Sequence, residues 1–400
     1  MRVLVLASLF PHLLNETLGL STYRRTVELA RRCEVRVVAL RTRVDVPERE
    51  VRGGVEVVRP LWRRVPKLGV FLDGYRYAAR VARALEGIRP DFDFDLIDAH
   101  WLYPDAFAAV RLGQRLGKPV AVTGRGSDVD EFLFRWPVRR LARAALRGAA
   151  QIVALTRRHK ERMIEAGAEA ERIAVIPNGV DTGLFCPGDR AEARRALGLP
   201  AEGVVLLSAG SIVRDKGHQH LIAGLARCIA DCQLPIADFG TSNSIGNRKL
   251  EIGNQLRLYI AGPGDYRGAL ERLARERGVA ERVTFLGRVA QSRMPLWYRA
   301  ADLFCFGSYH EGCPNAVLEA LACGTPVVST DVGGIPDLVD EGRSGILFAP
   351  RSDEAFAAAL RTALAKPWDR AEIAEIGSRR SWAHVAAEYH RAFGEMLARR

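Results

Sequence analysis

Two carboxylates stand eight positions apart in the segment E-G-C-P-N-A-V-L-E, which runs from Glu311 to Glu319. Pro314 favours the start of a helix there, so the first backbone N–H groups would point out of the positive end of its dipole. Those groups belong to Asn315, Ala316 and Val317. Such a helix end can cradle a phosphate, and a carboxylate on each side can accept hydrogen bonds from sugar hydroxyls. A phosphate between hydroxyl-rich groups describes a nucleotide sugar.

A glycine loop with one lysine follows the apolar run 204–208. Gly210 lets the backbone approach a phosphate, and Lys216 supplies a compact cation. Ser211 and Arg214 lie between them. Alone, this loop fits an ordinary strand-to-helix turn equally well. Its place in the same half of the chain as Glu311 strengthens its assignment to a phosphate site.

Two further strand ends in the second half carry residues suited to the same rim. Gly262 and Gly264 follow the apolar run 256–261, and Arg288 follows the run 283–285. A glycine there permits close approach of a ligand, although a tight turn explains it equally well. Arg288 fits a nucleotide contact as well as it fits a surface position.

The first half carries its own polar residues after apolar runs. Gly19 precedes a predicted helix, and His100 ends the run 96–99. Arg125 and Asp128 follow the run 120–123. Ligands of parallel sheets bind at the carboxyl ends of strands, so these residues are predicted on the acceptor side. The alternatives are a structural histidine and a helix-capping aspartate.

Composition allows two domains and bears on several classes of protein. The chain has 400 residues, 48% of them hydrophobic, with a net charge of +12. No apolar run is long enough to span a bilayer, and the start lacks a signal-peptide pattern, so a cytoplasmic protein is expected. Seven scattered cysteines suit a reducing compartment, and their spacing predicts no metal site. The arginines form no nucleic-acid motif, so no nucleic-acid partner is expected.

Alternating strand and helix patterns position these residues on two α/β units. The predicted strands are 3–7, 35–40, 96–99, 120–123, 152–154 and 174–176 in the first half. In the second half they are 204–208, 256–261, 283–285, 303–306 and 326–329. We therefore predict two doubly wound Rossmann-like domains, residues 1–182 and 183–380, facing across a cleft. Residues 381–400 are predicted to form a helix that packs back on the N-terminal domain.

Two segments differ from this plan. From 228 to 255 the arginine–alanine bias disappears, which predicts an inserted surface loop or, alternatively, a loop that binds a partner. The stretch Leu133–Arg147 mixes aromatic residues with arginines and, with Trp62–Arg64, could rest on an anionic membrane surface. An ordinary solvated helix is the alternative.

The ordered set of motifs resembles the family 4 retaining glycosyltransferases of the GT-B fold. The motifs are P-N-G-V-D at 177–181, the Lys216–Gly217 loop, A-G-P-G at 261–264, Glu311-x7-Glu319 and Gly333–Gly334. Y-P-D at 103–105 and R-G-S-D at 125–128 resemble the branch that makes teichuronic acid and other surface polysaccharides.

The resemblance implies roles for particular residues. Glu319 would bind the donor ribose, Glu311 would lie beside the transferred sugar, and Lys216 would contact the pyrophosphate. His100 would approach the sugar from the other domain. Many members carry arginine where this chain has Ser211, so either Arg214 replaces it or Lys216 carries the charge alone.

The expected activity is transfer of a sugar, with retention, from a nucleotide-diphosphate donor to a glycan or lipid-linked acceptor. No cofactor and no metal is expected. The alternatives are an epimerase or a phosphorylase on the same fold, or an inactive homologue.

Overall fold

The computed structural model describes residues 1–62, 70–233 and 256–399, which form two compact units. The first unit comprises Met1–Gly179 together with the chain from Ser381 onward, and the second comprises Val180–Arg380. The chain passes from the first unit to the second between Gly179 and Val180, and returns between Arg380 and Ser381. Each unit is an α/β layered structure, as predicted.

The described part of the first unit is built on an eight-stranded sheet in the order β3-β4-β2-β1-β5-β6-β7-β8. β3 and β4 pair antiparallel, and the other pairings are parallel. The strands are β1 (Arg2–Ala7), β2 (Glu34–Ala39), β3 (Arg49–Arg52), β4 (Val55–Val58), β5 (Leu96–His100), β6 (Val120–Thr123), β7 (Gln151–Ala154) and β8 (Ile173–Val175). The helices are α1 (Leu20–Ala30), α2 (Val70–Glu86), α3 (Phe107–Leu116), α4 (Arg139–Gly148), α5 (Arg157–Glu165) and α14 (Trp382–Ala398). Short helical turns follow β5 and β6, namely η1 (Leu102–Ala106) and η2 (Asp128–Phe132).

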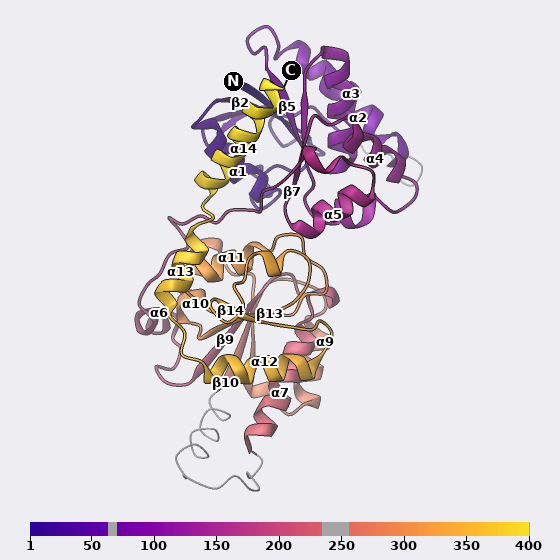
Figure 1. Ribbon diagram of the computed structural model, residues 1–400. Helices are drawn as coiled ribbons and strands as arrows, with labels where there is room; N and C mark the ends of the chain where they lie inside the picture. The colour runs from indigo at the N-terminus through magenta and orange to yellow at the C-terminus, as the bar shows by residue number, and fades with distance from the viewer. Residues whose placement is uncertain (63–69, 234–255, 400) are drawn as a thin grey trace. The chain divides into compact units, whose positions relative to one another are not determined.

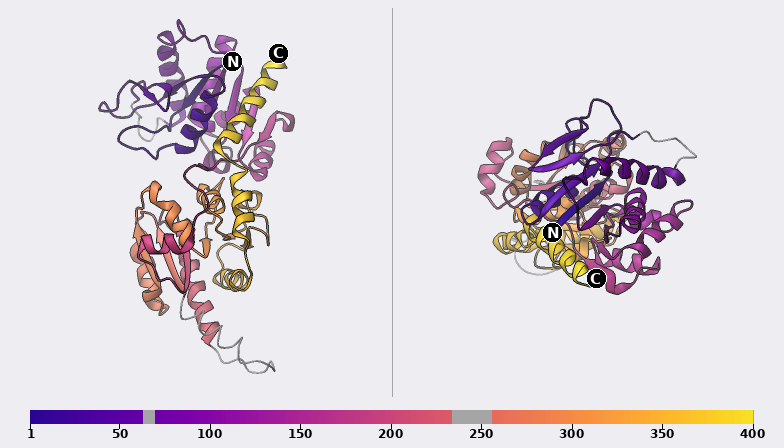
Figure 2. Two further views of the ribbon diagram at one scale, coloured as in Figure 1. Left: turned by 90° about the vertical axis from the view of Figure 1, so that its left-hand side faces the viewer. Right: turned by 90° about the horizontal axis from the view of Figure 1, so that it is seen from above.

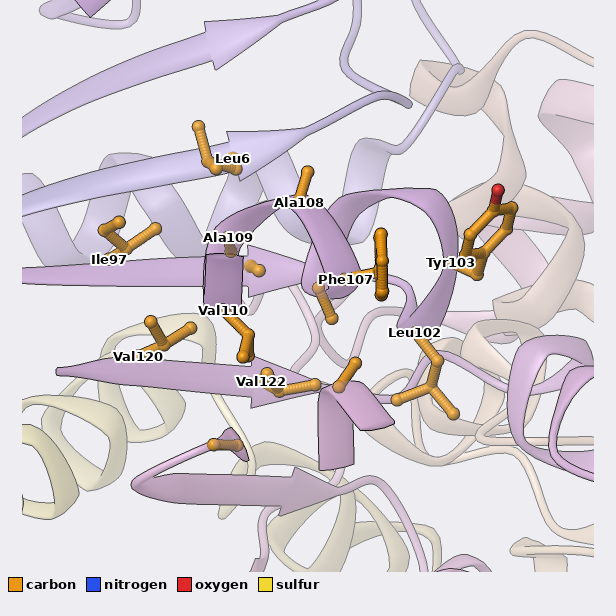
Figure 3. Packing of buried hydrophobic residues seen from close by; sticks show 14 of the residues in the cluster. Leu6, Ile97, Leu102, Tyr103, Phe107, Ala108, Ala109, Val110, Val120 and Val122 are labelled. Carbon is orange, nitrogen blue, oxygen red and sulfur yellow. The ribbon is translucent and has the colours of Figure 1, made fainter. Parts of the chain in front are cut away.

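Alternate residues of β1, β2 and β4 to β8 feed two separate cores. Leu4 and Leu6 of β1 pack with α2, α3 and α4 on one face, whereas Val3 and Val5 pack with α1 and α14 on the other. Figure 3 shows the first core, where Leu6 and Ile97 of neighbouring strands lie near the apolar side of α3. Because both faces are covered, the strands read as continuous apolar runs.

The last helix belongs to the first unit. α14 lies along α1 in Figures 1 and 2, where it is the yellow helix. Tyr389 and Phe393 of α14 are buried with Val3 and Val5 of the sheet. The end of the chain therefore completes one face of the N-terminal sheet.

The second unit, over its described residues, contains a six-stranded parallel sheet in the order β11-β10-β9-β12-β13-β14. The strands are β9 (Val204–Ala209), β10 (Leu256–Ala261), β11 (Val283–Gly287), β12 (Leu303–Phe306), β13 (Val327–Thr330) and β14 (Gly345–Phe348). The helices are α6 (Arg190–Leu197), α7 (His218–Gln233), α9 (Arg267–Glu276), α10 (Met294–Ala300), α11 (Asn315–Ala322), α12 (Asp353–Ala365) and α13 (Arg370–Ser378). β9 and β12 lie side by side at the centre, and the chain winds outward from them in both directions.

The first residues of the predicted insertion 228–255 are helical. Residues 228–233 continue helix α7, and Cys228 is fully buried in the core formed with α9 and α12. Residues 234–255 of the predicted insertion lie outside the described part of the chain. The loss of compositional bias at 228 therefore does not mark the end of a secondary-structure element.

Candidate functional site

The predicted site residues of the second unit gather at one edge of its sheet. They follow β9, β10, β11 and β12, and the carboxyl ends of parallel strands share an edge. The residues after β9 and β12 are direct neighbours there, since these two strands pair with each other.

Lys216 and Glu311 form an ion pair at this edge. Lys216 Nζ lies 2.5 Å from Glu311 Oε1, and the side chains are 27% and 11% exposed. Lys216 lies in the turn η4 (Arg214–Lys216) after β9, and Glu311 lies in the loop after β12. The pair brings together the cation predicted to contact the pyrophosphate of the donor and the carboxylate predicted to lie beside its sugar.

Glu319 lies in α11 and is held by a buried tyrosine. The hydroxyl of Tyr298, from α10, donates to Glu319 Oε2 at 3.0 Å. Burial and the adjacent carboxylate raise the pKa of Tyr298, so the tyrosine remains a neutral hydrogen-bond donor. One oxygen of Glu319 is thereby fixed in direction.

The start of α11 differs in one respect from the prediction. The helix begins at Asn315 with Pro314 as its N-cap, as expected. The backbone N–H of Val317, however, donates to the carbonyl of Pro314 at 3.2 Å. Asn315 and Ala316 are half-buried at the same end. Val317 was predicted to offer its N–H to a ligand, but that N–H already has a partner within the turn.

Close packing against the loop after β9 accounts for two glycines after β10. Gly262 has φ 147°, and a Cβ on it would lie 1.8 Å from the carbonyl oxygen of Gly210. A Cβ on Gly264 would lie 2.1 Å from the carbonyl oxygen of Ile212. Contacts this close exclude any side chain, so the two loops interlock at the sheet edge. Interlocking requires these glycines whether or not a ligand is bound.

The remaining predicted donor contacts lie on the surface. Ser211 and Arg214 are exposed in the loop after β9. Arg288 is exposed directly after β11. These side chains have room to meet an anionic ligand, and their roles stay predictions.

A hydrogen-bonded network of polar side chains near Glu311 was not predicted from the sequence. His220 of α7 lies between two partners, with Nδ1 at 2.5 Å from Asp353 Oδ1 and Nε2 at 2.8 Å from the hydroxyl of Tyr309. Gln219 also bonds that hydroxyl, and the Arg351 guanidinium lies 4.7 Å from the tyrosine ring centroid. This network connects the loop that carries Glu311 to α7 and α12. Its members come from distant segments, so sequence spacing carries no signal for it.

In the first unit, His100 lies in a buried cluster at the end of β5. Its Nε2 is 2.7 Å from Arg25 Nη2 and 3.2 Å from Asp98 Oδ2, and all three side chains are at most 1% exposed. Burial lowers the pKa of His100 to about 4. The pKa of Asp98 falls to about 2, because attraction from Arg25 and His100 outweighs its own burial. His100 is therefore neutral near pH 7.

Asp128 and Arg125 occupy the turn after β6. Asp128 is fully buried, and Oδ1 accepts from the backbone N–H groups of Arg125 and Gly126, each at 2.8 Å. Its Oδ2 accepts from the N–H of Leu102 at 2.9 Å. Asp128 thus joins the loops after β5 and β6 and orients the backbone of Arg125. The N-cap of η2 is Ser127, and the bonds of Asp128 go to N–H groups before the turn, so the predicted helix-capping role is not what the structure shows. Acceptor roles for Arg125 and Asp128 stay predictions.

Gly19 is the N-cap of α1 and has φ 62°. A Cβ on it would lie 2.1 Å from the carbonyl oxygen of Leu9. Gly19 lets α1 begin directly beneath the loop that follows β1.

Asp105 is a buried carboxyl that the residue patterns did not single out as a site residue. Ser8, after β1, bonds it twice, through its backbone N–H to Oδ1 and through Oγ to Oδ2 at 2.8 Å. The hydroxyl of Tyr77 lies 3.3 Å from Oδ1. Burial raises the pKa of Asp105 from 3.8 to about 7.

Over the described ranges, no group of three or more His, Cys, Asp or Glu side chains is arranged to hold a metal ion. Among the same residues, no helix is long and apolar enough to cross a bilayer.

Family models match both parts of the chain. Residues 19–184 match the model described as Glycosyltransferase Family 4, and residues 189–380 match Glycosyl transferases group 1. A D-inositol 3-phosphate glycosyltransferase from Acidothermus cellulolyticus is 31% identical over 378 residues, which cover 89% of this chain and 80% of the relative. The corresponding protein of Stackebrandtia nassauensis is 34% identical over 242 residues, 58% of this chain and 51% of the relative. The match thus spans about half the length of that second relative.

Solved structures share the fold. A sucrose-phosphate synthase from Thermosynechococcus elongatus superposes with a TM-score of 0.77 at 21% identity, covering 100% of both chains. Anabaena HepE in complex with UDP gives a TM-score of 0.72 at 21% identity, covering 99% of this chain and 100% of that one. The predicted GT-B architecture of two Rossmann-like domains is confirmed. Together with the two family models and the Acidothermus relative, this shows that the chain belongs to the family 4 glycosyltransferases.

Proposed function

We propose that the protein transfers a sugar, with retention, from a nucleotide diphosphate to a hydroxyl acceptor. The observation that carries this proposal is the ion pair of Lys216 with Glu311 at the junction of β9 and β12, in the same segment as the oriented carboxylate of Glu319. A cation for the diphosphate and carboxylates for hydroxyl groups then lie along one edge of the second unit. Family membership supports this function over an epimerase or a phosphorylase.

Each residue has a defined task in this proposal. Lys216 stabilises the negative charge that grows on the leaving diphosphate, together with the start of α11. Glu319 accepts hydrogen bonds from the ribose, and Glu311 accepts them from the transferred sugar. The bond from the anomeric carbon to the diphosphate oxygen breaks as the bond to the acceptor oxygen forms, and the acceptor proton passes to the departing diphosphate. No covalent intermediate on Glu311 is required.

For the donor base, we propose uridine. The support comes from two solved structures of Anabaena HepE, which has the same fold: one is a complex with UDP and the other a complex with UDP-glucose. For the acceptor, we propose a glycan or lipid-linked acceptor of surface polysaccharide synthesis. D-inositol 3-phosphate is the second candidate, because relatives at 31–34% identity carry that acceptor in their names.

We further propose peripheral contact with an anionic membrane through the start of α4. Leu141 and Leu146 of this helix are buried in the core, whereas Arg139 and Arg140 are exposed. Trp136, just before the helix, is 82% exposed. An exposed tryptophan beside arginines suits the interface of a bilayer with anionic lipids, where each basic residue contributes about 1 kcal/mol.

The same membrane hypothesis does not extend to Trp62. Trp62 is 7% exposed and is therefore unavailable to a bilayer. Arg63 and Arg64 lie outside the described residues.

Two experiments test these proposals. Product analysis with UDP-glucose and either acceptor should show transfer with retained anomeric configuration, and inverted product would contradict the proposed reaction. Co-sedimentation with phosphatidylglycerol–phosphatidylcholine vesicles should weaken in Trp136→Ser but not in Val51→Ser, which alters a residue 74% exposed on β3. Equal sedimentation of both variants and the wild type would exclude Trp136 as a membrane contact.

A further inference from the structure

Four side chains around the start of α7 form one directed series of hydrogen bonds. Nδ1 of His220 lies 2.5 Å from Asp353 Oδ1, and Nε2 of the same ring lies 2.8 Å from the hydroxyl of Tyr309. Gln219 Nε2 also bonds that hydroxyl, and it donates to the carbonyl of Arg214 at 3.1 Å. Both ends of the series are therefore groups that only accept, a carboxylate and a backbone carbonyl.

The two acceptor ends decide where each hydrogen lies. The Gln219 amide must turn its NH2 group toward the Arg214 carbonyl, so its second N–H donates to the oxygen of Tyr309. Burial raises the pKa of Tyr309, so the hydroxyl keeps its one hydrogen and donates it to Nε2 of His220. Nε2 is then bare, and the proton of the neutral ring lies on Nδ1 and points at Asp353.

The other two protonation states of His220 break this series. A ring protonated on Nε2 alone would set a bare Nδ1 against the carboxylate of Asp353, and two acceptors 2.5 Å apart repel each other. An imidazolium would donate to the hydroxyl of Tyr309 from Nε2. Among the described residues, that hydroxyl bonds His220 and Gln219, so its own hydrogen would then have no acceptor there.

The series fixes the two loops that carry Lys216 and Glu311. Tyr309 lies two residues before Glu311, and its backbone N–H donates to the carbonyl of Asp215 at 2.8 Å. Asp215 directly precedes Lys216, whose Nζ lies 2.5 Å from Glu311 Oε1. A displaced Tyr309 would therefore shift both the cation and the carboxylate of the ion pair.

We propose that Asp353 and His220 are positioning residues that hold the hydroxyl of Tyr309 and, through it, the ion pair of Lys216 with Glu311. The effect on transfer rests on the proposed function, whereas the direction of the hydrogen bonds does not. None of the three network side chains needs to touch the substrate. Their effect should therefore appear in the rate of the transfer step, where charge grows on the diphosphate, and not in donor affinity.

Nitrogen NMR on protein labelled at its eight histidines tests the direction of the series. The His220→Gln variant identifies the signal of this ring. At pH 8 we expect a bare Nε2 and a protonated Nδ1. A ring protonated on Nε2, or an imidazolium, would overturn the proposal.

Two substitutions break the series at different points. Tyr309→Phe removes the hydroxyl and keeps the ring, and Asp353→Ala removes the last acceptor. Each should lower kcat about fivefold in transfer from UDP-glucose with little change in donor KM, as expected for one lost hydrogen bond that acts through the ion pair. Asp353→Asn should retain most of the rate, because its amide oxygen can still accept from Nδ1 of His220.

Matched controls separate positioning from a general effect of each substitution. Tyr75→Phe makes the same change at a tyrosine 39% exposed whose ring also lies under an arginine. Glu354→Ala removes a carboxylate 74% exposed from the same turn of α12. Both controls should match the wild type in kcat. Wild-type kcat in Tyr309→Phe or Asp353→Ala, or equal losses in the controls, would overturn the positioning role.

The outcomes distinguish this proposal from the proposed function. If the wild type shows the Nδ1 tautomer of His220 but forms no product with any nucleotide sugar, the proposed function fails and the directed hydrogen bonds stand. If the wild type forms product and Tyr309→Phe forms it at the same rate, the positioning role is excluded and the proposed function stands.

Discussion

Replacing Asp105 with asparagine should change how the stability of the first unit depends on pH. Asp105 is fully buried, and its partners are Ser8 and Tyr77. Asparagine has the shape of the protonated carboxyl: its oxygen can accept from the Ser8 N–H and its amide can donate to the Ser8 hydroxyl. The substitution therefore keeps the packing and removes only the titration.

The direction follows from the raised pKa of Asp105. Between pH 3.8 and about 7 the unfolded chain has lost this proton while the folded protein retains it. The folded state then binds more protons, so stability falls as pH rises through this window and levels off above it. A pKa raised from 3.8 to about 7 corresponds to a loss of at most about 4 kcal/mol.

Buried histidines act in the opposite direction. The pKa values of His100 and His218 are both lowered to about 4 by burial, so these residues add stability as pH rises from about 4 to 6.5. The total pH profile therefore mixes both signs. The difference between wild type and Asp105→Asn isolates the aspartate, because the histidines contribute equally to both proteins.

Urea unfolding at intervals from pH 4.5 to 7.5 measures that difference. The advantage of Asp105→Asn over the wild type should grow steadily with pH. Asp91→Asn, the same substitution at an exposed position, should run parallel to the wild type. A constant difference between wild type and Asp105→Asn across the range would refute the reasoning.

Two further substitutions test the donor edge of the second unit. Tyr298→Phe keeps the buried ring but removes the hydrogen bond to Glu319, so UDP-glucose affinity should fall by about 1 kcal/mol, or fivefold, in calorimetry; an unchanged Kd would show that the hydroxyl does not orient the carboxylate. Gly262→Ala should destabilise the unit more than Gly278→Ala, because both glycines have positive φ but only a Cβ on Gly262 meets the backbone of Gly210. Gly278→Ala should cost about 1 kcal/mol in urea unfolding, and equal losses would contradict the interlocked loops.

The sequence predicted most of the parallel strands, because burial on both faces gives them continuous apolar runs. The runs at 120–123, 256–261 and 303–306 match β6, β10 and β12 residue for residue. The residue patterns did not predict β3, the edge strand of its sheet, its neighbour β4, or β14, the edge strand of the other sheet. The strand β3 (Arg49–Arg52) is exposed or only half-buried at every position and carries charged side chains. It therefore lacks the continuous apolar run of a strand that is buried on both faces.

The candidate site was predictable only where its chemistry depends on local spacing. Glu319 and the start of α11 follow from the Glu311–Glu319 segment itself. The pairing of Lys216 with Glu311 depends on the adjacency of β9 and β12, which the order of strands along the chain does not provide. The contact of Arg25 with His100 joins residues 75 positions apart, and His220, Tyr309 and Asp353 meet in the same way from distant segments.

Calorimetric titration of UDP-glucose into wild type and Glu319→Ala tests the proposed donor site most directly. We expect saturable binding to the wild type and loss of that binding in the variant, with both proteins equally folded by circular dichroism. Equal affinity of the two proteins for the nucleotide sugar would contradict the donor site at Glu319.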